Sequence, residues 1–474
     1  MDIKYALMKS PMCAADISDG SERGEYVPQK YLFNALGRPS RAVNLMYEYH
    51  PNDKNWPETG FIENKLYKRN RRTNGYFPYM GIETAGTACE PFKSMRDIRR
   101  FGQDVILTMT FDLDTPDEHL VQIAKDLRPF GSIIFRINHE CNGHWFTYNK
   151  ENTYREVSGF FIRFHKILKT HAPNVRTNAC LNGVHPGGSD VTYHMGEKEL
   201  APAFRIADVI SYDSYHSLHW GWPHDGYDPA ASNFSSAVSD VKKMGKMTCK
   251  QWWELFFDFN ELMLRVNRGN QKEIYLGEVN TDADIVGPAA QAEWVKEFYN
   301  DVKKKKLSYL KGITYYQFRD RGGLGLEYEI DEERTKGRPN PSLNAYREAV
   351  KDPYFSPVLE EKGLVEWPAV LEWESSTCAI GVMFSFIIPS GASKCLLVFP
   401  LEANLIVKAG SMWFHKDAGC AELDISAAAE PGVLNKVFVF APPVTGENTY
   451  DPDNPRYLDV YKYNLTRNPD IILK

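Results

Sequence analysis

The stretch Ser132-Ile-Ile-Phe-Arg136-Ile-Asn-His-Glu140-Cys-Asn-Gly-His-Trp145 decides the fold, because an apolar run changes abruptly into a polar one. Its first part is short, branched and apolar, as in a β-strand that is buried on both faces. Its second part places one carboxylic acid, Glu140, among hydrogen-bonding side chains and beside an aromatic ring. Such side chains at the end of a buried parallel strand are typical of a functional site.

A second carboxylate follows another apolar run. Glu273-Ile-Tyr-Leu-Gly277 predicts a strand, and Glu278 comes directly after it. Because the C-terminal ends of parallel strands meet at one edge of a sheet or barrel, we expect Glu140 and Glu278 on the same rim. The alternative interpretation of Glu278 is a structural salt bridge that closes this rim.

Short apolar runs alternate with longer helical patterns between residues 40 and 350, which indicates βα units and a parallel sheet. Eight strands are predicted, over residues 44–49, 77–82, 104–110, 133–137, 175–180, 209–212, 274–277 and 313–318. The helical patterns between them include residues 118–127, 154–170, 251–266 and 289–306. The expected fold class is therefore α/β, a (β/α)8 TIM barrel, with the two glutamates after strands four and seven.

The length of 474 residues exceeds that of one ordinary domain. We predict a catalytic barrel over residues 1–355, whose first 40 residues are an extended lead-in that caps the barrel floor. Beyond it, runs such as Ile380-Gly-Val-Met-Phe-Ser-Phe-Ile-Ile388 and Lys436-Val-Phe-Val-Phe440 alternate with turn residues. Residues 356–474 are therefore expected to form an all-β, sandwich-like accessory domain.

The charge balance and hydropathy exclude several classes of partner. Lys plus Arg (56) against Asp plus Glu (62) gives a net charge of −6, whereas nucleic-acid binding normally needs a basic face. No apolar run is long enough to span a membrane, and residues 1–8 lack the pattern of a signal peptide. The eight scattered cysteines suit a reduced compartment. We expect no nucleic acid, membrane or obligate protein partner, and a cytoplasmic protein unless a leader has been removed.

Glu140 and Glu278 have the chemistry of a glycoside-cleaving pair. Such a site needs an acid that protonates the leaving oxygen, a second carboxylate, polar partners for hydroxyls and a flat ring for a sugar face. Carboxyls about 5–5.5 Å apart would give retention through a glycosyl-enzyme, and about 6.5–9.5 Å would give inversion. The hypothesis assigns Glu140 as the acid/base and Glu278 as the nucleophile.

Neighbouring motifs have other interpretations. A zinc site at His139, Glu140 and His144 is not expected, because the histidines are five residues apart on a strand-to-loop segment. We expect no metal and no cofactor. Trp220 and Trp222, in the loop after strand six, are placed to stack on a sugar. The basic cluster over residues 65–72 predicts a solvated helix face or, alternatively, a grip on an anionic glycan.

Two segments resemble glycoside hydrolase family 26, within the clan A barrels. The family carries Arg-Pro-x-His-Glu-x-Asn-Gly-x-Trp-Phe around its acid/base, and residues 136–146 match this pattern except that Ile137 replaces the proline. Asp208-Val-Ile-Ser-Tyr-Asp213-Ser-Tyr215 is similar to the family's Asp-x-x-Gly-x-Asp-x-Tyr at strand six. The resemblance implies a retaining β-glycoside hydrolase, and many members of the family are β-mannanases.

The resemblance also implies roles for the residues around the two glutamates. Tyr215 would hydrogen-bond the nucleophile and His139 would contact the sugar in the cleavage subsite. Arg136 and Asn142 would hold carboxylates or hydroxyls, and Trp145 would stack. Strand eight lacks the tryptophan common in clan A, so two other rings are expected as the platform below the reacting sugar: Tyr316 and Phe318.

Two alternatives stay open. The barrel could act on an anionic or marine galactan, as the basic cluster at 65–72 suggests. From a different functional class, the chain could be a non-catalytic carbohydrate-binding protein. Retention of both glutamates argues against the non-catalytic protein, and the expected function is cleavage of β-mannan or a related β-glycan.

Overall fold

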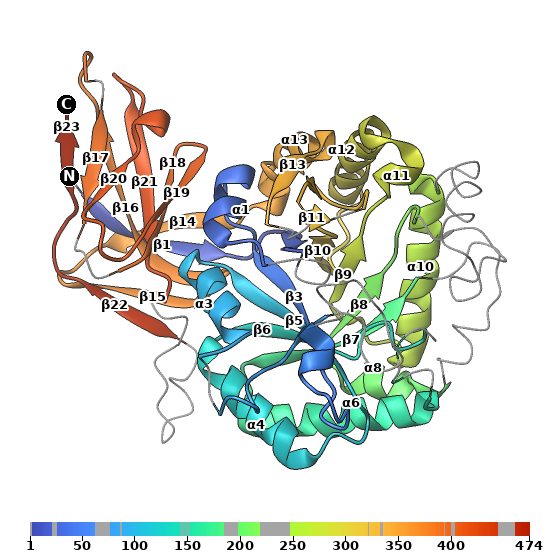
Figure 1. Cartoon of the computed structure of the whole chain (residues 1–474). Helices are drawn as coiled ribbons and strands as arrows, with labels where there is room; N and C mark the ends of the chain where they lie inside the picture. The colour runs from blue at the N-terminus through green and yellow to red at the C-terminus, as the bar shows by residue number, and fades with distance from the viewer. Residues whose placement is uncertain are drawn as a thin grey trace.

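The structure is a computed structural model, in which a barrel ringed by helices lies beside a β-rich module that carries both chain termini (Figure 1). It describes residues 2–20, 26–61, 76–85, 88–143, 146, 148, 151–183, 198–218, 247–320, 322–331, 335–392, 394–399, 403–443 and 460–474.

A closed ring of parallel strands forms the centre of the larger body. In the described part of the chain the ring runs β2-β10-β9-β8-β7-β6-β5-β3 and closes through pairing of β2 with β3. Its strands are β2 (Ala14–Ser18), β3 (Ala42–Tyr49), β5 (Asp104–Phe111), β6 (Ile133–Ile137), β7 (Val175–Asn182), β8 (Val209–Asp213), β9 (Ile274–Val279) and β10 (Leu310–Tyr315). This is the eight-stranded barrel that the sequence predicts.

One predicted barrel strand is wrong and one observed strand was not predicted. The run at 77–82 is not a barrel strand: only β4 (Phe77–Pro78) forms there, and it pairs with Tyr47 and Glu48 of β3 beside the ring. Proline lacks the N–H that a central strand donates, which explains the short pairing. The missing strand is β2, which the alternation of apolar runs does not reveal because Asp16 and Ser18 are polar. The strand that is lost and the strand that is gained both come before β5 in the chain. The fourth and seventh barrel strands are therefore still β6 and β9.

The helices cover the outside of the barrel (Figure 1). They are α1 (Gln29–Leu36), α3 (Phe92–Arg100), α4 (Asp117–Leu127), α6 (Tyr154–His171), α8 (Ala201–Ile206), α10 (Cys249–Val266), α11 (Ala283–Val286), α12 (Pro288–Lys305) and α13 (Pro341–Val350), with 3-10 turns η1 (Arg128–Phe130), η2 (Pro353–Phe355) and η3 (Ser426–Ala428). The helices predicted from periodicity correspond to α4, α6, α10 and α12. None of the described helices has the length and apolar character needed to cross a membrane.

Capping residues mark where two of the long helices begin. Thr153 accepts from the backbone N–H of Glu156 at the start of α6, and the Glu156 side chain accepts from Thr153 in return. Thr248 and Gln251 form the same reciprocal pair at the start of α10. Each of these reciprocal pairs, called a capping box, satisfies backbone donors that the first helical turn leaves unpaired.

Antiparallel strands form the second body. In the described residues, one sheet contains β14 (Val358–Leu364), β1 (Ile3–Lys9), β16 (Cys378–Ile387), β21 (Leu434–Phe440), β18 (Leu405–Ala409) and β19 (Met412–Lys416), with β15 (Ala369–Ser375) and β22 (Tyr461–Leu465) paired onto it. The second contains β20 (Glu422–Asp424), β17 (Cys395–Val398) and β23 (Asp470–Leu473). Apolar side chains of both sheets share one core, so the predicted sandwich-like fold of the C-terminal module is confirmed. A small sheet of β11 (Arg319–Asp320), β12 (Glu327–Glu329) and β13 (Gly337–Pro339) follows the last barrel strand.

The N-terminal segment does not form an extended lead-in. β1 pairs along its whole length with β16 and also with β14, so the first strand of the chain completes the C-terminal sheet. β2 then enters the barrel, and α1 follows it. The chain therefore passes from the β module into the barrel and back again.

An apolar interface joins the two bodies. Phe101, at the end of α3, packs in one buried cluster with Trp373 and Ile406 of the β module. The ring of His415 stacks on Phe101 with centroids 3.8 Å apart. Nearby, the hydroxyl of Ser376 donates to Asp104, at the start of β5, across 2.8 Å. The two bodies are thus held together by both packing and hydrogen bonds.

Candidate active site

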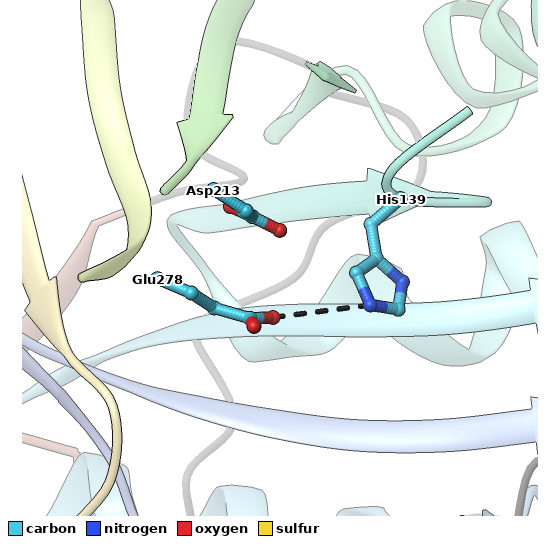
Figure 2. Close-up of side chains that lie close together, drawn as sticks. All are labelled: His139, Asp213 and Glu278. Carbon is cyan, nitrogen blue, oxygen red and sulfur yellow. Dashed lines mark ion pairs between the residues drawn. The ribbon is translucent and has the colours of Figure 1, made fainter. Parts of the chain in front are cut away.

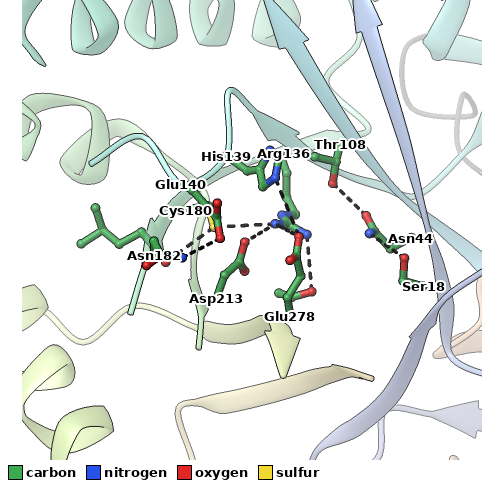
Figure 3. Close-up of polar contacts among 12 residues, drawn as sticks. Ser18, Asn44, Thr108, Arg136, His139, Glu140, Cys180, Asn182, Asp213 and Glu278 are labelled. Atoms are coloured by element: carbon green, nitrogen blue, oxygen red, sulfur yellow. Dashed lines mark hydrogen bonds and ion pairs between the residues drawn. The ribbon is translucent and has the colours of Figure 1, made fainter. Parts of the chain in front are cut away.

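The two glutamates lie at the C-terminal ends of the fourth and seventh barrel strands (Figure 3). Glu140 comes just after β6, and Glu278 is the penultimate residue of β9. Both side chains are buried, Glu140 with 8% and Glu278 with 5% of its surface exposed. Burial makes each hydrogen bond and charge around them count more than it would in water.

Glu278 is held by donors on both oxygens. Nη2 of Arg136 donates to Oε1 at 2.9 Å, and the hydroxyl of Tyr215 donates to Oε2 at 2.5 Å. Arg136 projects from β6 and Tyr215 follows β8, so three strands converge on this carboxylate. The two bonds hold both oxygens of this carboxylate in one orientation.

A third carboxylate, Asp213, lies between these groups. It ends β8 and is fully buried, and it forms an ion pair with the same Nη2 of Arg136. Burial raises the pKa of Asp213 well above its usual range, Arg136 opposes this, and the charges of Glu278 and Glu140 raise it further. For Arg136, burial alone would lower the pKa, but Asp213, Cys180 and Glu278 raise it well above its usual value.

His139 lies beside Glu278 in its neutral form. Its Nε2 is 3.8 Å from Oε1 of Glu278 (Figure 2) and 3.5 Å from the hydroxyl of Tyr76. Burial, together with the positive charge of Arg136, lowers the pKa of His139 well below its usual value. A neutral imidazole can donate to or accept from a sugar hydroxyl.

The backbone around Glu140 has an unusual conformation. Asn138 has φ of 47° and Glu140 has φ of 54°, the left-handed region that non-glycine residues seldom occupy. The side chain of Asn138 accepts from the N–H of Phe111 at 2.7 Å, and the N–H of Cys141 donates to the carbonyl of Cys180 at 3.1 Å. Neighbouring strands therefore hold the strained turn in place, as is common at functional sites.

The carboxyl group of Glu140 has a partner on the next strand. Nδ2 of Asn182, the last residue of β7, donates to Oε1 of Glu140 at 2.7 Å. The backbone of Asn182 is held in turn by Asn142: its N–H donates to Oδ1 of Asn142 at 2.8 Å, and its carbonyl accepts from Nδ2 of Asn142 at 3.2 Å. The loop after β6 and the end of β7 thus form one hydrogen-bonded unit.

The groups around Glu278 also include a possible set of metal ligands. One atom each of His139, Asp213 and Glu278 lie within 4.8 Å of one another (Figure 2). However, Nη2 of Arg136 already contacts both carboxylates. A permanent positive charge between the two acidic ligands repels a cation, so this set does not fit a metal ion.

The predicted site residues are distributed as follows. The structure brings Arg136, His139, Glu278 and Tyr215 into direct contact, and the ring of Tyr316 packs edge-on against Tyr215 with centroids 5.7 Å apart.

Two other predicted residues face the protein. Both ends of the Asn142 amide bond to Asn182, and the fully buried ring of Phe318 packs edge-on against Tyr31 of α1. Trp145, Trp220, Trp222, His144 and the basic cluster at 65–72 lie outside the described residues.

Two residues of the site were not assigned a role from the sequence. Asp213 lies in a motif used for the resemblance, and its position at the end of the sixth strand is the signal that indicates it. Asn182 ends the fifth strand and is indicated by the same rule. Neither residue type is distinctive alone.

Comparison with known proteins finds similar folds at low sequence identity. No family model and no curated protein sequence matches the chain. A solved GH26 β-mannanase from Bacteroides ovatus is 11% identical with a TM-score of 0.41, over 72% of this chain and 89% of that one. An α-L-arabinofuranosidase from Thermotoga maritima is 12% identical with a TM-score of 0.43, over 93% and 99%. A family 39 glycoside hydrolase from Bacteroides cellulosilyticus is 11% identical with a TM-score of 0.43, over 91% and 81%. These structures are glycoside hydrolases, but at such values the similarity identifies no reaction.

Proposed function

We propose that the protein is a retaining glycoside hydrolase that cleaves a β-glycosidic bond by double displacement. The observation that carries the proposal is the placement of two buried glutamates at the C-terminal ends of the fourth and seventh strands, beside Arg136 and Asp213 (Figure 3). One glutamate is held by two donors and the other by an amide. Two carboxyls in different environments at one rim are what acid and nucleophile roles require.

Glu278 is the proposed nucleophile. Arg136 and Tyr215 hold its two oxygens, so the carboxylate meets the anomeric carbon in a fixed orientation. Attack forms a carbon–oxygen bond to Glu278 and breaks the bond to the leaving oxygen. The negative charge of Glu278 is lost in this step, and Arg136 remains paired with Asp213.

Glu140 is the proposed acid/base. It gives its proton to the leaving oxygen in the first step, and then takes a proton from the water that attacks the glycosyl-enzyme. The water oxygen bonds to the anomeric carbon and displaces Glu278, which regains its negative charge. His139, neutral and 3.8 Å from Glu278, is placed to hydrogen-bond a hydroxyl of the sugar in the cleavage subsite.

The proposed substrate is β-mannan or a related β-glycan. This assignment rests on the sequence motif over residues 136–146. The alternative substrate is an anionic or marine galactan, whose negative charges the basic cluster at 65–72 would bind. Purified protein assayed against β-mannan, xylan, mixed-linkage glucan and galactans, neutral and sulfated, separates these substrates. Tight binding without product release from any of them would instead support a carbohydrate-binding protein.

Azide rescue tests the two catalytic roles separately. With an activated aryl β-glycoside, Glu278→Ala is expected to be inactive and to regain turnover in azide, releasing the α-glycosyl azide. Glu140→Ala is expected to release the β-glycosyl azide, because azide then attacks the glycosyl-enzyme. Wild-type turnover by either variant, or the opposite pair of anomers, contradicts the assignment.

A further inference from the structure

We infer that Asn182 is the positioning residue that determines which oxygen of Glu140 carries the catalytic proton. This inference rests on the proposed function and adds a residue to it. The observation is the 2.7 Å hydrogen bond from Nδ2 of Asn182 to Oε1 of Glu140. An amide nitrogen can only donate, so Oε1 is always an acceptor in this contact.

The consequence concerns the second oxygen of the carboxyl group. When Glu140 is protonated, the proton must lie on Oε2, because Oε1 already accepts a hydrogen from Asn182. Oε2 is therefore the oxygen that transfers the proton to the leaving group. As the proton leaves, negative charge develops on the carboxylate, and a neutral hydrogen bond to Oε1 becomes a charge-assisted one. Asn182 thus stabilises the transition state of proton transfer more than the ground state.

The orientation of Asn182 does not depend on its own side chain. Asn142 clamps the backbone N–H and the backbone carbonyl of Asn182. Asn142 is fixed in its turn, because its carbonyl accepts from the hydroxyl of Tyr154, on α6, at 2.9 Å. A substitution at position 182 therefore removes the donor to Glu140 and leaves the loop attached to β7. This separates a loss of positioning from a loss of structure.

The leaving group gives the decisive measurement. Substrates with a poor leaving group, such as an alkyl glycoside or a natural oligosaccharide, need protonation, whereas a dinitrophenyl glycoside does not. In Asn182→Ala we expect kcat/KM to fall by about 10- to 100-fold on the poor leaving group, the value of one hydrogen bond to a charged group. On the dinitrophenyl glycoside we expect a change of less than about threefold, since no acid is needed there.

Two further variants complete the experiment. Asn182→Leu keeps a similar size and has no donor, so it should show the same selective loss. Asn267→Ala removes a buried asparagine that bonds the carbonyl of Met263 at the end of α10, and controls for the structural cost alone. Equal losses on both leaving groups, or no loss on either, would overturn the role of Asn182. Failure of the proposed function is seen separately, as wild-type activity in Glu140→Ala or Glu278→Ala.

Discussion

The hydroxyl of Tyr215 lies 2.5 Å from Oε2 of Glu278, and the ring of Tyr215 packs edge-on against Tyr316. The phenol is therefore held in place by its neighbour, and its one hydrogen points at the carboxylate. Arg136 donates to the other oxygen, so the carboxylate cannot rotate without breaking a bond at one end.

Tyr215→Phe removes this donor and leaves the ring in place. We expect kcat/KM to fall by roughly 10- to 100-fold, because a hydrogen bond to a charged group contributes about 1.5–3 kcal/mol. The melting temperature should change little. Tyr299→Phe, which removes a hydroxyl from the buried face of α12, is the matched control and should retain activity. An active Tyr215→Phe enzyme would show that this hydroxyl does not orient Glu278.

Arg136→Met is expected to affect folding as well as activity. Arg136 is fully buried and pairs with Asp213 and Glu278, so its removal leaves two buried carboxylates without their shared cation. Breaking a buried pair in this way costs about 3–5 kcal/mol. The free energy of unfolding in urea measures the loss. Arg155→Met, at a position 84% exposed, should change it by less than about 1 kcal/mol.

The sequence predicts the barrel well where strands are apolar and ends are polar. β6 and β9 have this pattern, which is why the ends of both strands could be assigned from residues 132–145 and 273–278. β2 does not, because Asp16 points to Arg41 inside the protein and interrupts the apolar run. β1 was missed for another reason. Its partners in β14 and β16 lie 349 to 381 residues away, and local periodicity carries no information on such pairing.

The contact between Asn182 and Glu140 was not predictable for a similar reason. The two residues are 42 positions apart, and the backbone of Glu140 is left-handed where the contact forms. Glutamate has no special preference for that conformation, so neither the turn nor the direction of the side chain follows from its identity. The residue types indicate the chemistry, whereas tertiary structure determines which atom bonds which.

A pair of glycines tests how closely the barrel and the β module pack. Gly102 and Gly37 have nearly the same φ, 70° and 72°. A Cβ on Gly102 would lie 2.9 Å from both Ile406 and Trp373, whereas one on Gly37 would have no neighbour within 4 Å.

Alanine at Gly37 should cost only the backbone penalty of about 1–2 kcal/mol. Alanine at Gly102 should cost this penalty plus about 1–3 kcal/mol of overpacking. Thermal unfolding of the two variants gives the difference directly. Equal destabilisation would mean that the interface is loose enough to admit a methyl group.

His415 makes the same interface sensitive to acid. Burial lowers the pKa of His415 from 6.5 to about 4, and the nearby Asp417 only partly opposes this. The unfolded chain therefore binds a proton near pH 6.5, while the folded chain does not until about pH 4. Protonation favours the unfolded state throughout this window, so this residue's contribution to stability falls as the pH drops from about 6.5 to about 4.

His415→Gln keeps a donor for the carbonyl of Arg100 and cannot titrate. Its free energy of unfolding should be lower at pH 7 but should fall less between pH 7 and pH 4.5 than that of the wild type. Parallel pH profiles for the two proteins would show that His415 does not carry this dependence.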